Sequence, residues 1–428
     1  MWRVLRHRNY ALLTGGNFVN QLGMWGRMIG TGWAAQKLTG SPLLVTAAHG
    51  SQFIPMLLLA PVAGLVSDRF DRRVVAVLGN VGTAAPSAAT AFLLATGHLT
   101  IAGLIAFSFL GGCFQSFVNP AVVALIPRVV PAGEVQAAVA VSNVLGNVSR
   151  FLGAALVGAI IAAFGTAAAF GYHAASLLLV VIPLMAVRIE KAPRVRSTEP
   201  MLTQLAGGFR CAREDPAIGN LLVLSVVIGI FVVQMPLMSL VARDLLHAGP
   251  SAYGLLNSVT GLGAIAGAIY AGRAAENAAR RRAIAVTTMA TAGSLLVVGT
   301  SHVLLMAAAG QVLFGFGLTG LMTATVALIT LATPDQYLGR VMALQGTAIG
   351  GMVPVCALLG GALADYVGTR TAIELAGTVL AVYGVWFIAR RLSRIQVVDA
   401  RLVHDEAPWR AAAPSAPVVP VAPAPAGP

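Results

Sequence analysis

Long apolar runs separated by short polar segments dominate the chain. The run at 43–66, for example, contains no Asp, Glu, Lys or Arg. A helix needs about 20 apolar residues to cross the hydrocarbon core of a bilayer, and only helices and closed barrels satisfy the backbone there. The runs are too long and continuous for barrel strands. They predict twelve membrane-spanning helices at 11–36, 43–66, 74–96, 100–125, 137–163, 167–187, 217–242, 253–272, 283–300, 303–331, 341–364 and 371–389.

The twelve predicted helices fall into two sets of six. The longest connection, 188–216, is rich in charge and proline, as a linker between two bundles would be. We therefore expect one six-helix bundle over 1–187 and a second over 217–394. The remaining residues, 395–428, are rich in Pro and Ala, a composition typical of a disordered tail.

An internal repeat supports the division. A shift of 203 residues places PAGEVQAAVAV on PDQYLGRVMAL and, without a gap, pairs Gly158 with Gly361 and Gly165 with Gly368. Such repeats place a substrate site at their interface, near the middle of the membrane. The predicted fold class is therefore an all-α polytopic membrane protein of two pseudo-symmetric six-helix bundles.

Composition excludes a soluble protein. Hydrophobic residues make up 57% of the 428 residues and charged residues only 10%, whereas soluble domains carry about 25% charged residues. The three cysteines lie far apart and form no CxxC pair. No pairing of nucleophile with base, metal-ligand pattern or nucleotide motif stands out, so we expect no enzyme, cofactor or metal. The first apolar run is too long for a cleavable signal peptide.

The formal net charge of +13 follows the predicted membrane topology. If the N-terminus is cytoplasmic, 23 Lys and Arg residues fall on the cytoplasmic side and only three on the outer side. This asymmetry is the positive-inside pattern. It predicts cytoplasmic termini in the inner membrane, with the lipid bilayer rather than nucleic acid as the partner of the basic charge.

The stretch GLVSDRFDRR at 64–73 resembles the signature of the major facilitator superfamily between its second and third helices. Gly64, Asp68, Arg69, Arg72 and Arg73 fill the pattern. Asp71 replaces the usual second glycine, as in the enterobactin-exporter-like branch of bacterial transmembrane secretion effectors. LTGSP, LIPRVVPAGEV and RFLGAALVG also resemble that branch, and the resemblance runs to about residue 394. Ala154 departs from it, since efflux members often have Pro there.

Two interpretations of the 64–73 cluster stay open. The arginines would anchor the loop in the cytoplasm whatever the family. The positive-inside pattern does not explain an acidic residue at this position. The resemblance implies that Asp68 faces the N-terminus of the eleventh helix, where Arg340 is a further partner. Helix N-termini attract anions. The resemblance therefore implies a conformational latch that stabilises the outward-facing state.

Arg27 and Arg150 are the charges inside predicted spans. A charge at mid-membrane costs about 2.5–3.5 kcal/mol on insertion scales, so such residues usually face the bundle interior and serve function. Structural hydrogen bonds between helices are the alternative, and Arg27 has the further option of extending to the membrane surface. Two buried arginines without a buried acid favour an anionic or phenolic substrate.

A proton-coupling group is harder to assign, because no Asp or Glu falls clearly at mid-membrane. The substitutes are His49 and His173, or the boundary acids Asp244, Asp365 and Glu374. A lone histidine in a helix is more often only hydrogen-bonded, although its ordinary pKa suits a proton switch.

Polar residues of spans 1, 4, 7 and 10 are the cavity candidates, because those spans usually line the cavity in the superfamily. They are Asn17, Asn20, Gln21, Gln115, Asn119, Gln234 and Gln311. GFGLTG at 315–320 matches a dinucleotide-binding pattern, but no strand precedes it, and close helix packing explains it better.

The favoured hypothesis is a monomeric secondary active efflux transporter. It would move a small hydrophobic, siderophore-like or antibiotic-like molecule out of the cell by alternating access, in exchange for protons. An importer, or a sensor or assembly partner without transport, stays open as the alternative.

Overall fold

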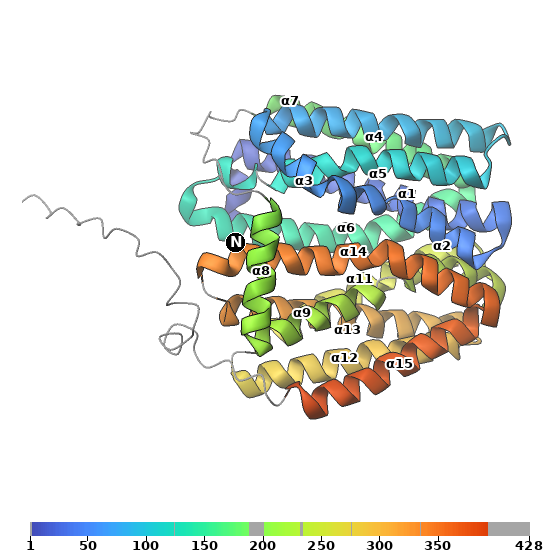
Figure 1. The fold of residues 1–428 in the computed structure, drawn as a ribbon. Coiled ribbons are helices and arrows are strands. Elements are labelled where there is room, and N and C mark those ends of the chain that lie inside the picture. Colours follow the sequence, from blue (N-terminus) through green and yellow to red (C-terminus); the bar gives the residue numbers. More distant parts are fainter. Residues whose placement is uncertain are drawn as a thin grey trace, which may run out of the picture.

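The structure, a computed structural model, describes residues 2–123, 125–187, 201–231, 234–274, 276–333 and 335–392. These residues are helical or lie in short connections, and none of them forms a strand. Most helices run side by side along one direction, with the first half of the chain above the second in Figure 1. This arrangement confirms the predicted fold class.

The first half contains six spans in seven helices. These are α1 (Arg8–Thr39), α2 (Pro42–Ser51), α3 (Ile54–Arg69), α4 (Arg72–Ala95), α5 (Ile101–Val123), α6 (Val135–Phe164) and α7 (Thr166–Ala186). Short 3₁₀ turns precede α1 and connect α5 to α6, namely η1 (Trp2–Arg6), η2 (Ile126–Arg128) and η3 (Ala132–Glu134).

The second half repeats this arrangement. Its helices are α9 (Pro216–Phe231), α10 (Gln234–Leu240), the π-helical turn η4 (Val241–Leu245), α11 (Pro250–Gly272), α12 (Asn277–Gly299), α13 (Leu304–Ala332), α14 (Asp335–Val367) and α15 (Thr369–Arg390).

Among the described residues, ten helical segments are long and apolar enough to cross a membrane. The first and seventh predicted spans are the other two, and both are helical wherever they are described. The amides and Arg27 lower the hydropathy of α1, and α9 reaches the required length only together with α10 and η4. We call the end with the start of α1 and the end of α15 the near end. The opposite end, at Gly40, Gly165, Gly249 and Gly368, is the far end.

The second span was predicted as one helix, but it is interrupted. A turn at Gln52–Phe53 separates α2 from α3. Pro55 lies in the first turn of α3, and its missing N–H cannot bond to the carbonyl four residues earlier. The break therefore follows from proline geometry, which the hydropathy pattern does not register.

An additional helix, α8 (Met201–Glu214), lies within the predicted linker. It crosses the near end at a steep angle to the spans (Figure 1). Cys211 is buried against the second half, whereas Phe209 is exposed. Gly208 lies against the backbone of Arg340, which places α8 over the first turns of α14. The rest of the predicted linker, 188–200, and the predicted tail, 395–428, lie outside the described residues.

The two halves meet along two helix pairs. α6 packs against α11, and α14 packs against α2. These pairs correspond under the internal repeat, since α6 and α14 contain the matched residues Gly158 and Gly361. Both contacts lie toward the far end.

Candidate functional site

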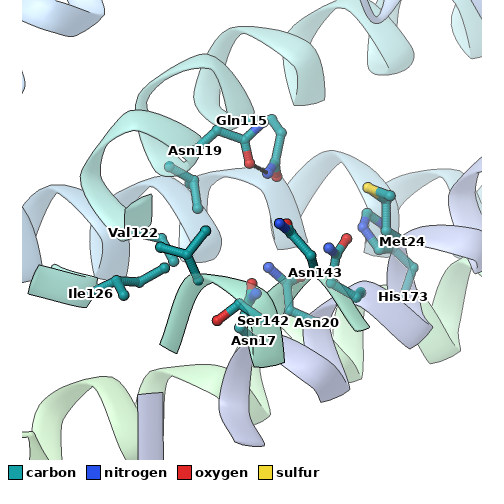
Figure 2. A pocket seen from close by; sticks show the side chains of 13 residues that line it. Asn17, Asn20, Met24, Gln115, Asn119, Val122, Ile126, Ser142, Asn143 and His173 are labelled. Carbon is teal, nitrogen blue, oxygen red and sulfur yellow. Dashed lines mark hydrogen bonds between the residues drawn. The ribbon is translucent and has the colours of Figure 1, made fainter. Parts of the chain in front are cut away.

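A cavity of about 350 Å³ lies inside the first half (Figure 2). It extends from Ile126, in the near-end connection, to Met24 and His173 at mid-span. α1, α5, α6 and α7 supply its walls. The lining residues are Asn17, Asn20, Gln21, Met24, Gln115, Val118, Asn119, Val122, Ile126, Val139, Ser142, Asn143 and His173.

Helical spacing explains how these side chains converge. Residues three or four apart lie on the same face of a helix, and the lining positions on each wall follow that spacing. On α1 they are 17, 20, 21 and 24, and on α5 they are 115, 118, 119 and 122. On α6 they are 139, 142 and 143. Each helix therefore presents one stripe to the cavity.

Most of the lining side chains are polar, and none of them is an Asp, Glu, Lys or Arg. His173 is the lining residue that could become charged, by taking up a proton. Carboxamides donate and accept hydrogen bonds, so their clustering suits a ligand with mixed polar groups. Nε2 of Gln115 donates to Oδ1 of Asn119 at 3.4 Å, which leaves other atoms of both groups for a ligand. Met24 and the valines supply apolar contact. The volume lies in the range of small-molecule sites, about 300–1,000 Å³.

The structure brings together several of the sequence candidates and separates others. Gln21, Gln115, Asn119 and His173 share the cavity with Asn17 and Asn20. Gln234 and Gln311 lie elsewhere, in the second half, where Nε2 of Gln234 donates to Oε1 of Gln311 at 3.3 Å.

Sequence reasoning missed Ser142 and Asn143. It considered only spans 1, 4, 7 and 10, whereas these residues come from the fifth span. The signal was nevertheless present, because Ser142 and Asn143 align at helical spacing with Gly146 and Arg150.

His173 forms the deep wall of the cavity. Its side chain is 1% exposed, and its Nδ1 lies 2.7 Å from Oγ of Ser87 on α4. That bond fixes the ring and directs the opposite nitrogen away from α4. His49, on α2, is also buried and stacks at a tilt on Phe53.

Arg27 is buried, with 8% of its surface exposed, so it does not extend to the membrane surface. Its Nε and Nη1 atoms have no hydrogen-bond partner among the described residues. Arg150 is partly exposed on α6, and within the described part of the chain no hydrogen bond or ion pair involves it. The alternative of structural hydrogen bonds between helices therefore finds no support at these atoms.

The 64–73 cluster lies at the near end, between α3 and α4. The surroundings of Gly64 and the side chain of Asp68 lie outside what the structure describes. Arg69 is exposed, and Nη1 of Arg73 donates to the carbonyl of Val187 at 3.0 Å, which ties α4 to the end of α7. Arg340 stacks over the ring of Tyr337 at 5.6 Å on α14.

Asp71, the departure from the usual glycine, has a local role. Its carboxylate Oδ1 accepts a hydrogen bond from the backbone N–H of Arg73 at 2.8 Å, so Asp71 is the N-cap of α4. Its φ of −66° needs no glycine. An N-cap aspartate is a preferred helix start.

The boundary acids Asp244 and Asp365 join the two halves at the far end. Nε2 of Gln36 donates to Oδ2 of Asp244 at 3.1 Å, and Oγ of Ser41 donates to Oδ2 of Asp365 at 2.8 Å. Glu374, the third boundary acid, lies beside Gly299 within the second half.

Two further far-end contacts cross between the halves. Nη1 of Arg243 donates to the carbonyl of Gln36 at 3.1 Å. The rings of Trp33 and Tyr253 stack with centroids 6.1 Å apart. These contacts hold the halves together at the far end, while the cavity extends to the near end.

GFGLTG lies inside α13, where its glycines pack against α11 and α12. Across the described ranges, no three His, Cys, Asp or Glu side chains gather as a metal site would require.

Comparison with known proteins identifies the family. The model of the transmembrane secretion effector family matches residues 1–416. The chain belongs to this family. Its fold is that of the major facilitator transporters: a POT family transporter in complex with a thioalcohol-conjugated peptide superimposes with a TM-score of 0.74 at 11% identity, covering 91% of this chain and 97% of that one.

Relatives of this secretion effector are transporters with efflux among their functions. An uncharacterized MFS-type transporter, YfiS of Bacillus subtilis, is 27% identical over 86% of this chain and 89% of its own. The enterobactin exporter EntS of Salmonella choleraesuis is 28% identical over 74% and 76%. Macrolide efflux protein A of Streptococcus pyogenes is 21% identical over 85% and 90%. The chain is thus a multi-span membrane transporter of small molecules, and its family and structural neighbours are transporters rather than enzymes.

Proposed function

We propose that the protein exports a small hydrophobic molecule, of siderophore-like or antibiotic-like chemistry, across the inner membrane by alternating access. One observation carries the proposal: the amide-lined cavity reaches the near end, while bonds between the halves close the far end. A carrier in this state loads from the near side.

The distribution of basic residues supports the direction of transport, from the cytoplasm outward. Among the described residues, 16 Lys and Arg residues lie at the near end and three at the far end, so the positive-inside rule supports a cytoplasmic near end. Loading from the near side is then loading from the cytoplasm, as export requires. The exporters EntS and Macrolide efflux protein A are relatives with that direction in their names.

Exchange for protons completes the proposal. Helices α1, α2 and α4 to α7 contain no Asp or Glu, so the histidines His49 and His173 are their titratable groups for this role. In alternating access, the latch at Asp68, Arg69, Arg72, Arg73 and Arg340 would close the near end when the far-end contacts open.

Transport into proteoliposomes with an imposed pH gradient tests the function. The panel would contain acidic siderophores, macrolides and cationic dyes. Uncoupler-sensitive flux of at least one hydrophobic member supports the proposal. Flux that follows a substrate gradient but not the pH gradient would contradict proton exchange. No flux of any member of the panel would contradict export.

A further inference from the structure

The lining stripe of α1 continues beyond the deep end of the cavity. Positions 17, 20, 21 and 24 line it, and the same helical spacing leads next to Arg27 and Thr31. Thr31 is fully buried, and its hydroxyl has no partner among the described residues. Two unpartnered polar side chains thus follow Met24 on the face of α1 that the cavity uses.

Other basic groups surround Arg27. Gly26 packs against the backbone and side chain of α7 at Ala169 and His173, which places Arg27 at the level of His173. The charge of Arg27 lies within electrostatic reach of both His173 and His49. Nδ1 of His49 and Oε1 of Gln52 are likewise buried without a partner in the described part of the chain.

Arg150 approaches the same level from α6. Gly146, one turn before it, lies beside Nε2 of Gln21, and Gly153, almost one turn after it, packs on Trp25. Arg150 therefore lies on α6 at the height of Met24, with its side chain partly exposed.

Among the described residues, no carboxylate bonds to Arg27, Arg150 or the two histidines. Helices α1, α2, α4, α5, α6 and α7 contain no acidic residue. Removing an unpaired cation from water is costly, and buried charges are normally paired. A charged guanidinium with unpartnered nitrogens next to a ligand-sized cavity therefore indicates that the counter-charge comes with the ligand.

We infer that the deep end of the cavity is an anion subsite, in which Arg27 binds a carboxylate or phenolate of the cargo and Arg150 provides a second positive charge. The inference rests on the proposed function, which it deepens by assigning the cargo's charge. The amides of the outer cavity would then hold the cargo's neutral polar groups.

Ligand binding to the purified full-length protein tests this subsite. The probes are salicylate and its neutral isostere salicylamide, and the readout is the ligand-dependent rise in the thermal unfolding midpoint, in a buffer free of chloride and of carboxylates. The wild type is expected to bind salicylate at least about 10-fold more tightly than salicylamide, because hydrogen bonds to charged groups are worth that factor or more.

Variants locate the effect. Arg27→Gln should lose the 10-fold preference and bind salicylamide as the wild type does, whereas Arg27→Lys should retain part of it. Arg150→Gln should reduce the preference less. Arg213→Gln, which changes an exposed arginine of α8, is the matched control and should leave the preference unchanged. Without ligand, Arg27→Gln should unfold at the same or a higher temperature, because it removes an unpaired buried charge.

Equal affinity for the two probes, no saturable binding of salicylate, or equal salicylate binding by wild type and Arg27→Gln would overturn the subsite. Chloride that stabilises the wild type more strongly than salicylate, and through Arg27, would overturn the assignment to the cargo. These outcomes are separable from the proposed function. Energised macrolide flux without salicylate binding rejects the subsite alone, and Arg27-dependent binding without any flux rejects transport alone.

Discussion

Gly158 of α6 and Gly254 of α11 bring the two halves of the transporter into backbone contact. A Cβ on Gly254 would lie 2.6 Å from the Cα of Gly158 and 2.7 Å from the carbonyl oxygen of Ala154. Small residues allow helices in a membrane to approach this closely. The repeat partner of Gly158, Gly361, packs in the same manner against Thr46 and Leu43 of α2. Two equivalent seams thus join the halves toward the far end.

The first prediction concerns this seam. Gly254→Leu should separate α6 from α11 and destabilise the far-end-closed state by about 1–3 kcal/mol, the usual cost of overpacking. Transport should fall, and the thermal midpoint should fall with it. Gly171→Ala on α7 is the control, since a Cβ there has open space, and it should preserve both quantities. Normal transport by Gly254→Leu would show that the close approach is dispensable.

The second prediction concerns the N-cap of α4. Asp71→Ala should cost about 0.5–2 kcal/mol of stability because the Arg73 N–H loses its acceptor. Asp71→Asn should be nearly neutral, and Asp71→Gly, which introduces the residue usual in the wider superfamily, should cost only a few tenths of a kcal/mol. The thermal unfolding midpoints of the three variants show whether their stabilities follow this order. If alanine is tolerated as well as asparagine, the cap does not stabilise the helix.

The third prediction concerns far-end closure. The double variant Gln36→Ala/Ser41→Ala removes the donors to Asp244 and Asp365, bonds to charged groups that are each worth about 1.5–3 kcal/mol. The population should shift toward a state with the far end open. Spin labels at positions 37 and 251, in a cysteine-free background, would report a longer distance between α1 and α11.

Thr96→Ala is the matched control for that shift, because its hydroxyl bonds only within its own helix at the same end. An unchanged distance distribution in the double variant would show that these bonds do not determine the closed state.

The fourth prediction concerns Cys211, on α8 outside the membrane spans. Burial, followed by the nearby charges of Asp215 and Glu214, raises the pKa of its thiol to about 11. The raised pKa leaves the thiol protonated at neutral pH, so alkylation should be slow there and rise about tenfold per pH unit toward 11. Mass spectrometry of iodoacetamide-treated protein measures the rate. Fast labelling at neutral pH would show that α8 does not pack on the second half as described.

Hydropathy and charge were enough to predict the architecture, because the bilayer imposes both helix length and loop charge. They missed the break at Gln52–Phe53, since proline geometry leaves hydropathy unchanged. They also missed α8, because an amphipathic helix across the near end has no continuous apolar run.

The candidate site was predictable only in part. Asn17, Asn20 and Gln21 were identified because they are polar residues of span 1, one of the spans that usually line the cavity in the superfamily. Ser142 and Asn143 were missed because the superfamily resemblance directed attention to other spans. Gln234 and Gln311 were included for the same reason, although they bond to each other and Gln234 lines a separate cavity in the second half. Sequence patterns show which residues are polar, but only tertiary packing shows whether they face a cavity or one another.

Uptake of an acidic siderophore into inverted inner-membrane vesicles, driven by an imposed pH gradient, tests the central claim of export through the amide-lined cavity. We predict uncoupler-sensitive uptake by the wild type and normal uptake by the control Thr96→Ala. Asn143→Leu should lower the uptake rate about tenfold or more, because leucine would fill the cavity without hydrogen-bonding the cargo. Uptake by Asn143→Leu at the wild-type rate, or uptake insensitive to the uncoupler, would contradict the account.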